Sequence, residues 1–202
     1  MADILKLVVV GDGGVGKTSL LLSFTTDTFP ADYVPTVFEN YTADIAVADT
    51  VRRVTLFDTA GQEEFDKLRP LAYPKTDVFL VCFCVASPAS YNNVKEKWLP
   101  EVRAICPDTP IVVVGTQTDR RGKEGISRHH HNTMQLSCNT AVSPSSPGPR
   151  LASFVPPELG ARLAKEARAA LYLECSALTR YISTHYTLDI YTLHTRYLHT
   201  IH

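Results

Sequence analysis

Residues 11–18 read Gly-Asp-Gly-Gly-Val-Gly-Lys-Thr and follow an apolar run over residues 4–10. The spacing Gly, four residues, Gly-Lys-Thr, between a predicted strand and a predicted helix, is typical of a loop that binds phosphate. Its glycines let backbone N–H groups approach an anion, Lys17 can reach terminal phosphates, and the Thr18 hydroxyl can bind magnesium. A plain glycine-rich turn is the alternative, but order, spacing and flanks together favour a phosphate site.

A second segment whose residues could take part in the chemistry begins at Asp58, directly after the predicted strand over residues 51–57. A carboxylate in that place can hold magnesium through water. Gly61 can then offer a backbone N–H to a terminal phosphate, and Gln62 can orient an attacking water. The alternative for Asp58 is a simple cap at a strand end.

A third segment, Thr116 to Asp119, follows the predicted strand over residues 111–114. The Asp119 carboxylate can accept two hydrogen bonds from guanine, one from the ring N–H and one from the amino group. Adenine presents an acceptor at the ring position, which would leave the carboxylate poorly paired. Asp119 taken alone could be a turn residue, but three such segments in this order favour a guanine nucleotide site.

Composition permits one soluble domain and excludes several classes of protein. The chain has 202 residues, is 45% apolar and 20% charged, and has a net charge of -1. This gives no broad basic surface, so we expect no nucleic-acid partner. No apolar run is long enough to span a bilayer, and we expect no secretory signal, because no basic region precedes an apolar segment at the N-terminus. Five cysteines without a Cys-x-x-Cys pair favour free thiols and a cytoplasmic location.

Strand and helix signals alternate along the chain, which predicts an α/β fold. We expect a mostly parallel, six-stranded sheet with helices on both faces, whose ligands bind at the carboxyl ends of the strands. The predicted strands cover residues 4–10, 41–47, 51–57, 78–85, 111–114 and 171–175. The predicted helices cover residues 17–26, 88–105 with a bend at Pro100, and 157–169, while residues 27–40 and 59–76 are predicted loops.

With these motifs in place, residues 4–119 resemble a small GTPase of the Rho family, a P-loop NTPase with a Ras-like fold. Residues 29–41 resemble the Rho-type first switch and residues 58–70 the second switch. Residues 174–178, Glu-Cys-Ser-Ala-Leu, resemble the last guanine-contacting loop. Phe57, together with Thr-Gln-x-Asp at 116–119, resembles the branch of the cell-division-control protein more than Rac or Rho proper.

The resemblance implies a role for each matching residue. Gln62, Lys17, Thr36 and Gly61 would be catalytic, and Thr18, Thr36 and Asp58 would bind Mg²⁺. The nucleotide, GTP or GDP, would be bound by Gly13, Gly14, Val15, Gly16, Lys17, Thr18, Ser19, Phe29, Tyr33, Thr36, Asp58, Gly61, Thr116, Gln117, Asp119, Ser176, Ala177 and Leu178. Gln117 stands where many relatives have a lysine stacked on the base.

The same resemblance implies a molecular switch that hydrolyses GTP slowly and signals to effectors of the actin cytoskeleton and cell polarity. We expect a monomer whose switches bind GTPase-activating proteins, exchange factors, dissociation inhibitors and effectors. Alternatives are a non-enzymatic decoy, a product that does not fold, and a P-loop kinase or ATPase. A P-loop kinase or ATPase is disfavoured by the segments Asp58–Gln62 and Thr116–Asp119.

Two regions depart from the family pattern. Residues 120–156 are polar and rich in Ser and Pro and contain three adjacent histidines, His129 to His131, which predicts a long disordered insert in a domain over residues 1–179. Residues 180–202 form a low-complexity tail in which the family's terminal helix is degenerate or missing. Family members usually reach the plasma membrane by prenylation, and we expect no prenyl anchor because no cysteine follows Cys175.

Overall fold

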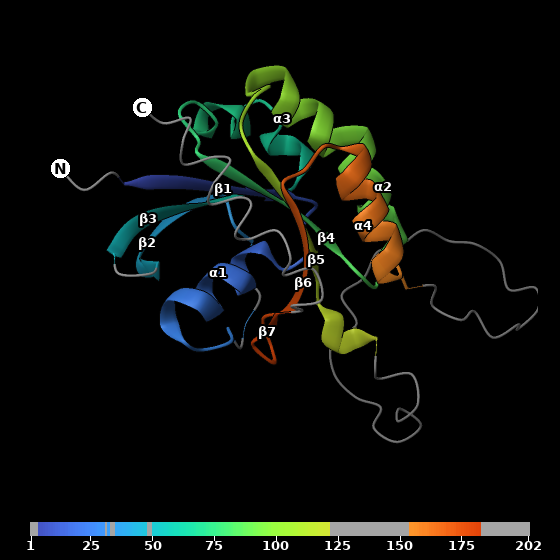
Figure 1. Ribbon diagram of the computed structural model, residues 1–202, viewed down its shortest axis with the longest axis horizontal. Helices are drawn as coiled ribbons and strands as arrows, with labels where there is room; N and C mark the ends of the chain where they lie inside the picture. The colour runs from blue at the N-terminus through green and yellow to red at the C-terminus, as the bar shows by residue number, and fades with distance from the viewer. Residues whose placement is uncertain (1–3, 31, 33–34, 48–49, 122–153, 183–202) are drawn as a thin grey trace, which may run out of the picture.

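The computed structural model describes residues 4–30, 32, 35–47, 50–121 and 154–182. Within these residues the strands form a seven-stranded sheet in the order β2-β3-β1-β4-β5-β6-β7 (Figure 1). The strands are β1 Leu5–Gly11, β2 Phe38–Val47, β3 Thr50–Thr59, β4 Val78–Cys84, β5 Ile111–Thr116, β6 Leu171–Ser176 and β7 Tyr181–Ile182.

The sheet is mostly parallel, as the sequence predicts. β1 pairs in parallel with β3 and β4, and the parallel pairing continues from β4 to β5 and from β5 to β6. The antiparallel pairs are β2 with β3 and β6 with β7. The prediction of six strands is one short, because the two-residue strand β7 lies in the segment that its composition assigns to the tail.

The register of the strands brings the chemical segments to one edge of the sheet. Val9 lies opposite Asp58, Gly11 opposite Cys82, and Cys84 opposite Thr116. The central strands β1 and β4 are buried along their carboxyl halves, as expected for apolar runs covered on both faces. The loops that leave these strands therefore meet at one place, where ligands of such sheets bind.

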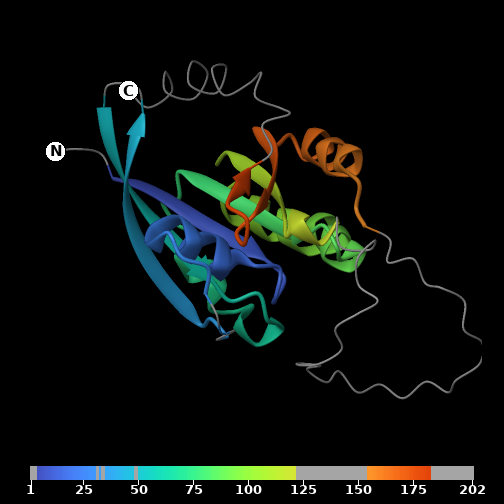
Figure 2. The same ribbon diagram turned by 90° about the horizontal axis from the view of Figure 1, so that it is seen from below.

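The helices divide between the two faces of the sheet, as predicted (Figure 1). Helix α1, Lys17–Thr26, lies on one face, while α2 Pro88–Asn93, α3 Leu99–Ile105 and α4 Pro157–Glu166 lie on the other. From below, α1 lies in front of the strands and the β2–β3 hairpin follows one side of the molecule (Figure 2).

The predicted helix over residues 88–105 forms as one continuous run, but its middle is irregular. Residues Val94–Trp98 form a π-helical turn that ends just before Pro100. Proline lacks an N–H group and its ring displaces the carbonyl four residues earlier, so a wider turn in front of it is a common adjustment. Ser87 begins the run by accepting a hydrogen bond from the Ser90 N–H group, as the Ser-Pro signal predicts.

The remaining differences from prediction are local. The predicted loop over residues 59–76 contains two 3-10 turns, Glu63–Phe65 and Arg69–Ala72, and a third turn, Thr118–Arg120, follows β5. Helix α4 ends at Glu166, three residues before the predicted end. No helix in the described part of the chain has the length and apolar character needed to cross a membrane.

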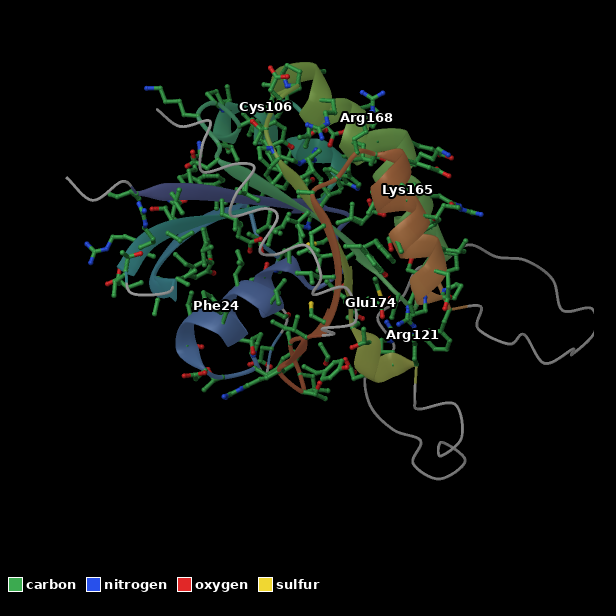
Figure 3. The ribbon with its side chains drawn as sticks, viewed as in Figure 1. Phe24, Cys106, Arg121, Lys165, Arg168 and Glu174 are labelled. Atoms are coloured by element: carbon green, nitrogen blue, oxygen red, sulfur yellow. The ribbon has the colours of Figure 1, made fainter. Side chains whose placement is uncertain are left out.

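Each face of the sheet has its own apolar core. The face of α2 to α4 is packed with large side chains, including Trp98, Tyr73, Phe79 and Phe83, none of which is exposed. The face of α1 is packed with smaller ones, including Val9 and Leu21. Phe24 on the outer side of α1 is half exposed (Figure 3). The aromatic core fixes the helix run 88–105 rigidly on the sheet.

An ion pair and two hydrogen bonds join Arg121, Val155, Val85 and Glu174. The Arg121 guanidinium donates to the Glu174 carboxylate and to the Val155 carbonyl (Figure 3). The Val155 N–H group also donates to the Val85 carbonyl, at 2.8 Å. Residues 122–153 of the predicted insert, with its three histidines, and the tail from residue 183 lie outside the described residues, so those predictions stay untested.

Candidate nucleotide-binding site

A cavity of about 640 Å³ opens at the carboxyl edge of the sheet, a size typical of sites for small ligands. Most of the predicted site residues line it, from the phosphate loop through the two switches to the loop after β6. Three do not: Val15 and Ser176 are buried beside it, and Asp58 lies beneath it. Tyr33 lies outside the described residues. The cavity is also lined by Leu20 and Leu22 of α1, which no motif singles out.

The phosphate loop connects β1 to α1 and bends sharply at glycines. Gly16 is the N-cap of α1 and has a φ of 94°, a left-handed conformation that favours glycine. It has no side chain to cap the first N–H groups of the helix, and an anion can take that place. The buried Lys17 ammonium donates to the carbonyls of Gly11 and Asp12, at 2.8 and 2.9 Å. Desolvation lowers the pKa of Lys17, partly offset by the charge of Asp58.

Three oxygen-bearing side chains meet below the loop. The Thr18 hydroxyl donates to Asp58 Oδ2 at 2.5 Å and lies 2.6 Å from the Thr36 hydroxyl. Asp58 is fully buried, its second oxygen Oδ1 has no hydrogen-bond partner, and desolvation raises its pKa. A buried carboxylate oxygen without a partner beside two hydroxyls is a donor set that suits a hard cation such as Mg²⁺. The residues present therefore fit the metal that the sequence predicts.

Gly61 and Gln62 lie against the phosphate loop. A Cβ atom on Gly61 would lie 2.3 Å from the Gly11 carbonyl oxygen and 2.4 Å from the Gly13 nitrogen, so only glycine fits. The Gln62 Oε1 atom is buried without a hydrogen-bond partner. A Cβ atom on Gly13 would lie 3.8 Å from Gln62 Cγ, which places this side chain directly over the loop. The unpartnered amide oxygen can accept a hydrogen bond from a water molecule.

The other end of the cavity carries the predicted base-reading residues. Asp119 lies in the 3-10 turn after β5, and the Ser176 hydroxyl donates to its Oδ1 at 2.7 Å. Gln117 has a positive φ of 59° and donates from Nε2 to the Gly14 carbonyl at 3.0 Å. The Ala177 carbonyl accepts from the Ser23 hydroxyl at 3.0 Å. These bonds hold the loops after β5 and β6 beside the phosphate loop.

The structure also shows site neighbours that the motifs do not predict. Asp12, inside the phosphate loop, accepts hydrogen bonds from Trp98 and Asn93. Arg69 donates to the backbone around Gly61. A carboxylate within an anion-binding loop is an unusual choice and is the one sequence signal that could have drawn attention to Asp12.

The fold and the cavity define a P-loop nucleotide-binding protein, with a phosphate end and a base end in one pocket. The family model for the Ras family matches residues 6–192, nearly the whole chain. The chain belongs to the Ras family. Proteins of this family are switches that bind guanine nucleotides, generally with Mg²⁺, and hydrolyse GTP. They interact with activating proteins, exchange factors and effectors.

Proposed function

We propose that this protein is a Rho-type GTPase switch that binds GDP and GTP and hydrolyses GTP slowly without a partner. One observation carries the proposal: Lys17, Gln62 and Asp119 line the same cavity, and Asp119 follows β5 whereas Gln62 follows β3, with β1 and β4 between them in the sheet. The distance between a guanine base and the terminal phosphate of GTP requires this separation. A phosphate loop alone would serve any nucleoside triphosphate.

In the proposed reaction a water molecule attacks the terminal phosphorus in line, and the bond to the GDP oxygen breaks to give GDP and phosphate. Gln62 accepts a hydrogen bond from the water and orients it. Lys17 and the N–H groups of the loop stabilise the charge on the phosphate oxygens. Thr18, Thr36 and Asp58 would hold Mg²⁺, which when bound neutralises phosphate charge.

We expect slow hydrolysis because Arg69, the arginine closest to the predicted catalytic residues in the sequence, is not free to contact the terminal phosphate. Arg69 is the arginine nearest to Gln62 in the sequence, and each of its guanidinium nitrogens already donates to protein acceptors. The Arg69 side chain is also 0% exposed, so its guanidinium is not available to a phosphate in the cavity. A partner protein that inserts an arginine would accelerate hydrolysis, as activating proteins do for related enzymes.

An exposed apolar surface beside the cavity supports the proposal of switch-dependent partners. Val37 and Phe38 of the first switch, Leu68 of the second switch and Leu71 just after it are large apolar side chains exposed to solvent. They line a groove of about 400 Å³ between the two switches. Contiguous apolar patches of this kind mark protein interfaces. We propose that effectors of actin and polarity signalling bind here, and a cytoplasmic location stays a prediction.

Nucleotide content provides the test. The full chain, purified with Mg²⁺, should hold about one guanine nucleotide per molecule and exchange it for GTP far better than for ATP. Single-turnover measurement of phosphate release from the GTP-loaded chain should show slow hydrolysis. Equal affinity for ATP and GTP would reject the proposal, and tight GTP binding with no hydrolysis, even with an activating protein, would identify a decoy instead.

A further inference from the structure

Arg69 is a buried arginine, and each of its three guanidinium nitrogens donates to protein acceptors. Its Nε donates to the Ala60 carbonyl at 2.8 Å, and Nη2 donates to the Gln62 carbonyl at 3.1 Å and to Asp66 at 2.5 Å. Its Nη1 donates to both oxygens of Glu101, at 3.1 and 2.9 Å. The side chain is 0% exposed. Because the guanidinium is planar, five bonds from it fix the relative positions of all its partners.

Two of these partners flank the turn that carries the predicted catalytic residues. The carbonyls of Ala60 and Gln62 stand on either side of Gly61, whose Cα packs on the phosphate loop without room for a methyl group. Arg69 thus binds this turn through the residues on both sides of Gly61. The orientation of the Gln62 backbone, and therefore the direction of its side chain, depends on these two hydrogen bonds from Arg69.

The phosphate loop is anchored to the same support. The Arg69 guanidinium lies over the Trp98 ring, 4.5 Å from its centroid, and the Trp98 indole N–H donates to Asp12 Oδ1 at 2.6 Å. Asn93 donates to the other Asp12 oxygen at 2.7 Å. The turn around Gly61 and the phosphate loop are therefore both fastened to the helix run 88–105.

We propose that Arg69 is a positioning residue for GTP hydrolysis, which holds Gln62 over the phosphate loop while Trp98 and Asp12 hold the loop itself. The inference rests on the proposed function and deepens it. Arg69 acts through Gln62 and not on the nucleotide, since each guanidinium nitrogen binds protein acceptors and the side chain is buried. Lys17 and Thr18, which bind the phosphates, make no bond to Arg69, so Arg69 affects the rate of hydrolysis more than the affinity for nucleotide.

The test is the variant Arg69→Lys, which keeps the charge but cannot span two carbonyls and two carboxylates. We expect single-turnover hydrolysis of GTP to fall between about 10-fold and 100-fold, the range for a small misplacement of a reacting group. Affinities for GDP and GTP should change by less than about threefold. Arg53→Lys is the matched control, because Arg53 pairs with Asp44 on the surface and should leave both quantities unchanged.

The outcomes separate this inference from the proposed function. A wild-type chain that binds no guanine nucleotide or hydrolyses no GTP overturns the proposed function and the inference with it. If the wild type hydrolyses GTP and the Arg69→Lys variant does so at the same rate, the inference alone is overturned. Equal losses of rate and affinity also overturn it, because they indicate a general structural role.

A second variant covers the case in which Arg69→Lys does not fold. Glu101→Gln keeps one oxygen acceptor for Nη1 but removes the charge and the second acceptor, which loosens Arg69 without touching its bonds to Ala60 and Gln62. Hydrolysis should fall by a smaller factor than in Arg69→Lys, with unchanged affinity for GDP. A Glu101→Gln variant that hydrolyses GTP at the wild-type rate would overturn the proposal.

Discussion

The two ends of the cavity are built differently. At the phosphate end the groups bond mainly to one another and to the backbone: Lys17 to the loop carbonyls, and Thr18 to Asp58. At the base end the side chains project from the ends of β5 and β6, as with Asp119 held by Ser176. The phosphate end is mostly a property of one continuous loop, whereas the base end depends on the alignment of two strands.

This difference assigns distinct tasks to the two ends. Fixed N–H groups and buried polar atoms at the phosphate end suit the stabilisation of charge that develops during a reaction. A carboxylate at a strand end suits discrimination between bases, because a wrong base leaves it unpaired. Two hydrogen bonds join the ends: Thr116 donates to the Val15 carbonyl and Gln117 to the Gly14 carbonyl.

The largest expected effect comes from breaking the base end alone with Asp119→Asn. Guanine would lose a carboxylate partner for two N–H donors, at about 1.5–3 kcal/mol for each bond, so affinity for GDP should fall about 10²- to 10⁴-fold. Xanthine has an oxygen in place of the amino group, and the asparagine amide can donate to it. Equilibrium titration should therefore show a gain for xanthosine diphosphate. Loss of affinity for both nucleotides would contradict a base-reading role.

Breaking the phosphate end alone should reduce the rate and spare the affinity. In Gln62→Leu the side chain keeps its approximate volume but cannot orient water, and single-turnover hydrolysis should fall about 10²-fold. Affinity for GDP should stay at the wild-type value. Glu64→Leu, an exposed neighbour in the same turn, is the control. A Gln62→Leu variant that hydrolyses GTP normally would exclude this residue from the reaction.

The same contrast explains how much the sequence could predict. The residues of the phosphate loop stand together in residues 11–18, and Asp58 and Asp119 come after predicted strands, so chain position alone indicates their place. Arg69 lies in a segment without periodicity, and its partner Glu101 is far along the chain. Which side chains meet across such a separation depends on packing, here that of the helix run 88–105 on its aromatic core.

Two fold details escaped prediction for related reasons. Strand β7 has only two residues, too few for a periodic pattern, and it forms because β6 offers it an edge. The sequence predicts only a bend at Pro100, because a proline indicates that the helix is irregular but not that it forms a π-helical turn. Tertiary context decides both features, so local propensity cannot predict them.

A smaller effect should follow from loosening the link between the two ends. The buried Thr116 hydroxyl donates at 2.5 Å to the Val15 carbonyl and at 2.9 Å to the Phe83 carbonyl, a donor shared by two acceptors. Thr116→Val would leave both carbonyls without this hydroxyl donor and lower the free energy of unfolding by about 1–3 kcal/mol. The melting temperature should then fall by about 2–10 °C. GDP should also dissociate faster. Thr42→Val on the exposed side of β2 is the control, and equal melting temperatures for both variants would show that the link is unimportant.

The smallest expected effect concerns the outer layer of the phosphate end, where Asp66 accepts hydrogen bonds from Arg69 and Lys97. Desolvation alone would raise the pKa of Asp66, but these bonds lower it. A folded-state pKa below the unfolded value stabilises the fold above about pH 3.9, and the gain is lost as the pH falls through the folded value.

Because the Asp66 side chain is 41% exposed, solvent screens the pair, and the gain should stay below about 1 kcal/mol. At neutral pH Asp66→Asn should therefore melt at most about 3 °C below the wild type, and this gap should close as the pH falls below about 3.9. Thermal melts across pH, with the exposed Asp108→Asn as control, provide the measurement. A gap that persists at low pH would show that the charge of Asp66 does not hold Arg69 in place, and that the grip on Gln62 comes from Glu101 and Trp98.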